Sequence, residues 1–404
     1  MAINSNAPKP RIPKATRITS VEQLLPTARD MVSKEASHMY EGVLVNKGTK
    51  VLFVNDPTAD QLVVESLTIA MRERGANVTT INLEGFPGLK DPVDMLDNMF
   101  SNNWYPDWVW DAAKQTDVLL ITAFIKEAHT PHPELPKNIF VDNLEMTADL
   151  MVSEYEKFPP EIRDKIDEVA WENLENCTKV KWTDLEGTDI NISPTAEEWA
   201  KATRRHKERT GRPYMHGHLM LPAPCEVMSG VFVTSSITFG GPIPRTTFTI
   251  EKGKAVKVEG GGKYGDRVRE SFTKYANLHK SKCPGPGVNW MTTIGICTHP
   301  KAQRSPFFDE LAGSARVYAW TFGHRRSGVL HSSIGEGMMS PNYKMIRHMD
   351  TYFNTVVTDK GPVVKDGRLT ALDDPRVRKV AEKYGDPDKL LTEIWIPAVS
   401  GVNA

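Results

Sequence analysis

The pattern of apolar residues changes near residue 177, and this change constrains the fold more than any other feature. Before it, short continuous apolar runs alternate with segments whose apolar residues recur every three or four positions. The runs predict buried strands and the periodic segments predict helices. We expect strands at 50–54, 78–83 and 117–124, helices at 21–40, 59–74, 95–100 and 106–114, and a helical link at 143–176. Strands joined through helices imply right-handed crossovers and a parallel sheet covered by helices.

The second half instead follows the period-two pattern of strands that bury one face. An antiparallel hairpin is expected around Gly187, and the glycine-rich segment 260–265 is interpreted as a turn. The hairpin pairs 179–182 with 190–192, and further strands are expected at 230–238, 245–252, 254–259, 315–322, 354–358 and 362–369. The predicted fold class is therefore α/β. An N-terminal parallel-sheet α/β domain with a helical linker (1–176) precedes a β-rich α+β metal-binding domain (177–404).

Charge and hydropathy limit the classes of partner. The 404 residues carry a formal net charge of -1, so no overall electrostatic field favours nucleic acid. No run of about 18 apolar residues occurs, and the N-terminus lacks the apolar segment of a signal peptide. The four cysteines show no C-x-x-C spacing, which suits a reducing compartment. We expect a cytoplasmic protein that acts on a small molecule, and the arm 1–17 and the segment 104–110 would suit a homo-oligomer contact.

Metal-binding residue types concentrate between Gly323 and Asp350. The segment contains His324 and His331, and His348 forms an H-x-D pair with Asp350. Alternate side chains of a strand face the same way, so this pair could present an imidazole and a carboxylate to one point. Two histidines and one carboxylate suit non-haem Fe(II) and leave coordination positions open. For the H-x-D pair alone, a packed histidine and a helix-capping aspartate remain the alternative.

Further polar candidates lie upstream of this segment. His216 and His218 flank a glycine, and either imidazole could serve as a general acid or base. Glu226 stands between Cys225 and Val227, an unusual place for a carboxylate that merely faces water. A solvated glutamate remains the alternative for this position.

The order of several short segments resembles a known family over roughly residues 180 to 370. These segments are DLEGTDINIS, LPAPCEVMSG, VEGGGKYG, IGICTHPKA, HSSIGEG, HMD and TVVTDKGPVVKDGRL. Their succession is similar to the core of the aminopeptidase T-like metallopeptidases and of their relatives, the 2,5-dihydroxypyridine 5,6-dioxygenases. The resemblance implies a metal site at the junction of the two domains. It matches Glu226, His331, His348 and Asp350 to metal ligands of the family.

Two ligands that the peptidase pattern implies are missing. The expected bridging glutamate falls on about Thr293, and the expected tyrosine falls on Met338. Two ions a few Å apart need bridging anionic oxygen, so a dinuclear peptidase site is not favoured. The first histidine of the dioxygenase pattern also falls near Thr293, and His331 is the obvious substitute because it restores two imidazoles and a carboxylate.

The sequence therefore predicts a mononuclear metal-dependent enzyme. We expect an Fe(II)-dependent ring-cleaving dioxygenase that uses O2 on a hydroxylated aromatic or N-heteroaromatic compound, with His331, His348 and Asp350 as ligands. Glu226 would be a fourth ligand or an acid/base beside His216 or His218. The alternative is a Zn(II) or Mn(II) hydrolase, similar to an aminopeptidase, acting on an amide or ring carbonyl. A metal-free binding protein on an enzyme scaffold is a third reading.

Overall fold

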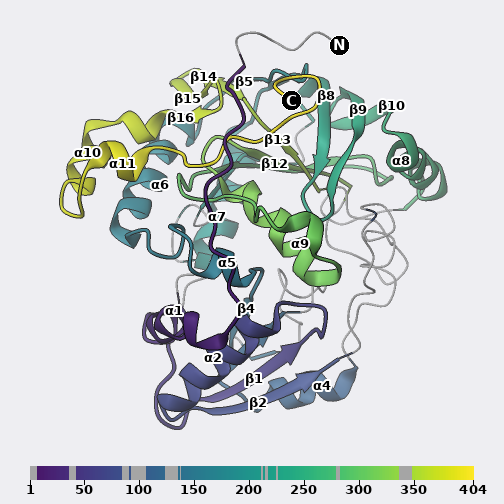
Figure 1. Ribbon diagram of the computed structural model, residues 1–404. Coiled ribbons are helices and arrows are strands. Elements are labelled where there is room, and N and C mark those ends of the chain that lie inside the picture. The colour runs from purple at the N-terminus through teal and green to yellow at the C-terminus, as the bar shows by residue number, and fades with distance from the viewer. Residues whose placement is uncertain are drawn as a thin grey trace.

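The computed structural model contains a small parallel sheet and a large antiparallel sheet, which lie in different parts of the molecule (Figure 1). It describes residues 7–35, 42–83, 91, 106–122, 135–136, 138–210, 213, 217–223, 226–278, 283–335 and 348–404. This arrangement confirms the expected α/β class with a β-rich second half. The expected domain boundary near residue 177 remains a prediction.

The parallel sheet has the strand order β2-β1-β3-β4. Its strands are β1 (Lys50–Asn55), β2 (Asn77–Asn82), β3 (Val118–Ile121) and β4 (Phe140–Asn143). The crossover helix α2 (Gln61–Glu73) begins at Asp60, whose side chain accepts a hydrogen bond from the backbone of Leu62. The three predicted strands and this helix are confirmed. The described residues of this half also form helix α1 (Leu25–Met31), preceded by the 3-10 turn η1 (Val21–Gln23), and helix α4 (Asp107–Ala113).

The predicted helical link needs one correction. Its first residue ends strand β4, and two separate helices follow, α5 (Ala148–Met151) and α6 (Pro160–Leu174). Proline lacks an amide hydrogen but is tolerated at the first position of a helix, so α6 begins at Pro160. The helix expected at 95–100 lies outside the described residues.

Within the described residues, the antiparallel sheet has twelve strands. Their order is β16-β15-β14-β5-β6-β8-β13-β12-β11-β7, and β9 and β10 branch from β8. The predicted hairpin is confirmed as β5 (Val180–Thr183) and β6 (Asp189–Ile192). The other strands are β7 (His218–Met220), β8 (Met228–Ile237), β9 (Gly241–Glu251), β10 (Lys254–Gly260), β11 (Met291–Cys297), β12 (Leu330–Ile334), β13 (His348–Thr351), β14 (Thr355–Thr358), β15 (Gly361–Lys365) and β16 (Arg368–Leu369).

The strand expected at 315–322 is wrong, because this segment forms helix α9 (Gly313–Thr321) and the 3-10 turn η4 (Phe322–Arg325). Every residue of α9 is buried. A helix that is buried all round shows no amphipathic period, so its sequence resembles that of a buried strand. The segment at 260–265 is also more than a turn, since α8 (Gly262–Lys274) begins there after two glycines with positive φ. The described residues also form α7 (Ala196–Thr210), η3 (Phe308–Glu310), η5 (Thr370–Asp373), α10 (Pro375–Ala381) and α11 (Pro387–Leu391).

Helix α9 lies between the two sheets (Figure 1). At its start, the backbone of Ser314 donates a hydrogen bond of 3.0 Å to Thr58 in the loop after β1. At its end, Thr321 donates to the backbone oxygen of Thr238, just after β8, at 2.8 Å. The N-terminal arm also contacts its own chain, because Arg11 and Ile396 form an antiparallel bridge. The expected homo-oligomer contact remains a prediction.

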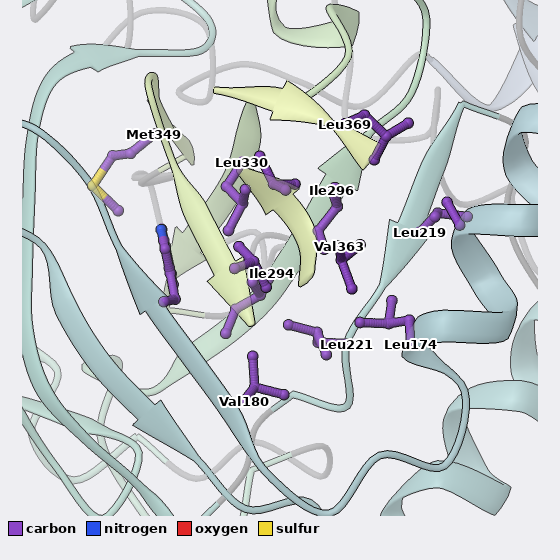
Figure 2. Close-up of a cluster of buried hydrophobic side chains, with 14 of the residues drawn as sticks. Leu174, Val180, Leu219, Leu221, Ile294, Ile296, Leu330, Met349, Val363 and Leu369 are labelled. Atoms are coloured by element: carbon purple, nitrogen blue, oxygen red, sulfur yellow. The ribbon is translucent and has the colours of Figure 1, made fainter. Parts of the chain in front are cut away.

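One face of the large sheet is apolar. Figure 2 shows Ile294 and Ile296 from β11, Leu330 from β12 and Met349 from β13 in one buried cluster that also includes Leu174 of α6. Because side chains alternate across a strand, the residues between these positions point to the opposite face. No helix in the described part of the chain is both long enough and apolar enough to cross a membrane.

Candidate functional site

The opposite face of strands β7, β11, β12 and β13 is polar. In the registers of these strands, His331 lies opposite Asp350 on one side and Gly295 on the other, and His348 lies opposite Ser333. Residues directly opposite in an antiparallel pair share a face and lie about 5 Å apart. The pleat and the register therefore bring His331, His348 and Asp350 together, although they come from two strands.

His331 is at the centre of this group. Its Nε2 lies 2.8 Å from Nδ1 of His348, and its Nδ1 lies 3.4 Å from Oδ1 of Asp350. Asp350 is fully buried and His331 is buried. Thus His348 and Asp350 contact opposite sides of the same imidazole ring.

Thr238 determines which nitrogen of His331 carries hydrogen. Its hydroxyl donates to Oδ1 of Asp350 at 2.8 Å and lies 3.1 Å from Nδ1 of His331. A hydroxyl that gives its hydrogen to the carboxylate can accept one from Nδ1, so the network favours the Nδ1–H tautomer. The lone pair of His331 is then on Nε2, the nitrogen that faces His348.

Two more histidines extend the group. The ring of His324, from η4, lies 5.0 Å from that of His331, and the ring of His218, from β7, stacks on His324 at 5.0 Å. Burial, with a smaller contribution from Arg325, holds the pKa of His324 well below its ordinary value. His324 is therefore neutral. We call His218, His324, His331 and His348, together with Asp350, the histidine cluster.

Gly295 makes room for the cluster. A Cβ at this position would lie 2.9 Å from the sulfur of Met220 and 3.7 Å from the ring of His218. The first distance is shorter than normal van der Waals contact, so a side chain here would displace the residues that surround it. Thr293, where the resemblance implies a ligand, lies on β11 opposite Ser333.

One predicted site residue that the structure describes, Glu226, is not joined to the cluster. Glu226 is exposed and precedes β8, whereas Thr238 follows the other end of this ten-residue strand, which spans about 30 Å. No hydrogen bond or ion pair between described residues connects Glu226 to the cluster. His216 lies outside the described residues, as does Met338.

The donor atoms fit a metal ion in part. Two nitrogens bound to one ion at about 2.1 Å and at a right angle are about 3 Å apart, close to the separation of the His331 and His348 nitrogens. Asp350 stands behind His331, where carboxylates commonly orient a metal-bound imidazole. Its buried Oδ2 has no hydrogen-bond partner among the described residues. In the described ranges, no three His, Cys, Asp or Glu side chains are arranged to hold a metal ion together.

Sequence reasoning did not identify Thr238 or Gly295 as part of the site. Thr238 precedes Asp350 by 112 residues and reaches it through the pairing of β8 with β13. A threonine at the end of a strand gives no local signal of this role, because strand register across such a separation cannot be derived from periodicity.

Comparison with known proteins supports the fold. No protein-family model matches the chain, and no curated protein matches it in sequence. Among solved structures, the 2,5-dihydroxypyridine dioxygenase from Pseudomonas putida KT2440 is similar, with a TM-score of 0.55 and 17% sequence identity. The match covers 87% of this chain and 98% of that chain. At this identity the likeness shows a shared fold across most of both chains.

Proposed function

We propose that this chain is a dioxygenase-like oxidoreductase that acts on a hydroxylated aromatic or N-heteroaromatic compound, with Fe(II) as its cofactor. The observation that supports this most directly is the pair of imidazole nitrogens 2.8 Å apart on His331 and His348. The pair lies in a buried polar cluster, on a fold shared with a 2,5-dihydroxypyridine dioxygenase.

His331, through Nε2, and His348, through Nδ1, would hold the metal ion. Asp350 and Thr238 would keep the hydrogen of His331 on Nδ1, which leaves Nε2 free for the metal. In this arrangement Asp350 is not a third ligand, because its Oδ1 lies beside Nδ1 of His331, on the opposite side of the ring from Nε2. When bound, Fe(II) supplies open coordination positions at which a ring hydroxyl and O2 can meet.

His218 is the residue best placed to move a proton. It is buried, and its ring lies 6.0 Å from that of His331. An imidazole at this distance can take a proton from a ring hydroxyl held beside the metal and return it later. Glu226 has no part in this proposal, because it is exposed and precedes the far end of β8.

Metal content and O2 consumption test the proposal together. The protein is loaded with Fe(II) under anaerobic conditions, bound iron is measured by elemental analysis, and an oxygen electrode follows reaction with 2,5-dihydroxypyridine and related ring compounds. We expect His331→Ala and His348→Ala to lose bound iron. Asp350→Asn should weaken iron binding about 10- to 100-fold, because it acts through His331.

His299→Gln is the matched control. His299 is buried like His331 but stacks on Tyr155, at a ring distance of 4.0 Å, outside the cluster. The proposal fails if both alanine variants remain folded and retain iron as the wild type does. Turnover with Zn(II) or Mn(II) in the absence of O2 would instead support the hydrolase alternative.

A further inference from the structure

A guanidinium group is held among aromatic rings beside the histidine cluster. The guanidinium carbon of Arg304 lies 3.3 Å from the ring centroid of Trp320, and the ring centroids of Tyr352 and Trp395 lie 5.2 and 5.0 Å away. Attraction between a cation and aromatic faces holds the group in place. Gly323 allows this packing, because a Cβ there would lie 2.4 Å from Cγ of Arg304.

This group lies on the same face of the sheet as the cluster. Tyr352 follows Asp350 by two residues, so in extended backbone both side chains point the same way, about 7 Å apart. Nη2 of Arg304 donates to the hydroxyl of Tyr352 and, at 3.1 Å, to the hydroxyl of Ser236. Ser236 also precedes Thr238 by two residues.

Arg304 forms no ion pair with a carboxylate among the described residues, although the buried Asp350 attracts its charge, and its hydrogen-bond partners are two hydroxyls. Tyrosine and serine hydroxyls are neutral near pH 7 and do not balance a positive charge. Its Nε is shut off from solvent without a partner in the described part of the chain, and its Nη1 donates to no described residue. Burial lowers the pKa of Arg304, yet arginine keeps its charge in proteins.

Two other buried arginines differ from Arg304 in this respect. Arg325 contacts Glu145 at 2.9 Å, and Arg316 contacts Asp309 at 3.7 Å. A charge withdrawn from water is costly unless an opposite charge or a set of hydrogen bonds compensates it. Arg304 is therefore a charged donor with hydrogen-bonding capacity that the described part of the protein leaves unused.

We propose that Arg304 binds the carboxylate group of an aromatic substrate whose ring lies beside the histidine cluster. The planar guanidinium can form charge-assisted hydrogen bonds with a planar carboxylate. The identity of the ring as substrate rests on the proposed function, but the binding of a carboxylate does not. Arg304 would thus determine specificity for an aromatic acid over its neutral analogues.

Binding of benzoate, compared with neutral benzamide, tests this inference on the full chain. Isothermal titration calorimetry measures the dissociation constants, with and without added Fe(II). We expect the wild type to prefer benzoate, and Arg304→Gln to weaken benzoate binding about 10- to 100-fold while leaving benzamide binding unchanged. Arg304→Lys keeps the charge but not the planar fork, so it should retain a preference for benzoate with a smaller loss of affinity.

Arg316→Gln is the matched control, because Arg316 also stacks on an aromatic ring, 3.6 Å from the centroid of Phe308. It should bind benzoate as the wild type does. The inference is overturned if the wild type binds benzamide as tightly as benzoate, or if folded Arg304→Gln binds benzoate normally. If Arg304→Gln does not fold, the inference is tested by the preference of the wild type for benzoate over benzamide and by the affinity of Arg304→Lys for benzoate. Loss of iron in His331→Ala with benzoate binding retained would separate this site from the metal.

Discussion

The carboxyl group of Glu186 should make the stability of this protein depend on pH. Glu186 lies in the turn of the β5–β6 hairpin and is 7% exposed. Neither carboxyl oxygen has a hydrogen-bond partner of normal geometry among the described residues, although Ser235 lies near enough to interact. Burial raises the pKa of Glu186 to about 8, and Asp184 adds to the shift. The side chain is therefore protonated in the folded protein at neutral pH.

The expected change in stability follows from this difference in pKa. A pKa that rises from 4.5 in the unfolded chain to about 8 in the folded protein corresponds to about 5 kcal/mol, at about 1.4 kcal/mol for each pKa unit. Between these two values the folded state binds a proton that the unfolded state has lost. The contribution of protonated Glu186 to the free energy of unfolding is thus complete below pH 4.5. It is lost progressively as the pH rises to about 8.

Glu186→Gln isolates this effect, because glutamine has a similar shape and does not titrate. Urea unfolding, followed by tryptophan fluorescence between pH 5 and 9, gives the free energy of unfolding of both proteins. Relative to the wild type, the free energy of unfolding of Glu186→Gln should increase as the pH rises to about 8 and then stay constant. Glu382→Gln, which removes an exposed charge, serves as control. If the wild type and Glu186→Gln show parallel profiles, the carboxyl group is ionised in the folded protein and the reasoning is wrong.

Substitutions at three further positions test the packing and hydrogen bonds around the histidine cluster. Gly295→Ala places a methyl group 2.9 Å from the sulfur of Met220, so we expect a loss of about 1–3 kcal/mol by urea unfolding and weaker iron binding. Thr238→Val removes the hydroxyl shared by the central histidine and the aspartate, which should cost about 1–3 kcal/mol, and Thr238→Ser should restore most of it. Glu145→Gln removes the carboxylate that Arg325 contacts in a buried ion pair, and a loss of about 3–5 kcal/mol in the unfolding free energy is expected. A change below about 0.5 kcal/mol for Gly295→Ala, Thr238→Val or Glu145→Gln would contradict the corresponding contact, since substitutions away from such features usually stay within that range.

Periodicity predicted several strands of the large sheet where one face is apolar and the other polar, such as β5, β6, β8 and β14, but it did not predict β7, β11 or β12. In β12, Leu330 belongs to the apolar cluster and His331 to the polar face, but all five residues are buried, so the alternation that marks a half-buried strand is missing. Helix α9 was missed because all of its residues are buried, so no polar side chain marks its outer face. Here the helix is defined by tertiary packing between the two sheets, and that packing is not encoded in a local pattern.

The H-x-D pair shows how far a spacing motif determines a site. Its spacing requires His348 and Asp350 to share a face of β13, and both do contact His331. Which nitrogen of His331 each one meets depends on the register of β12 with β13, which places His331 directly opposite Asp350 and two pairs away from His348. That register puts the carboxylate at Nδ1 and the second imidazole at Nε2. The same three residues can thus act as two metal ligands and one orienting carboxylate, and the order of their contacts favours this arrangement over three ligands. Asp350→Asn distinguishes an orienting carboxylate from a third ligand. If Asp350 only orients His331, the substitution weakens iron binding and leaves the coordination of bound iron unchanged in X-ray absorption spectra. If Asp350 is a direct ligand, the substitution changes that coordination as well.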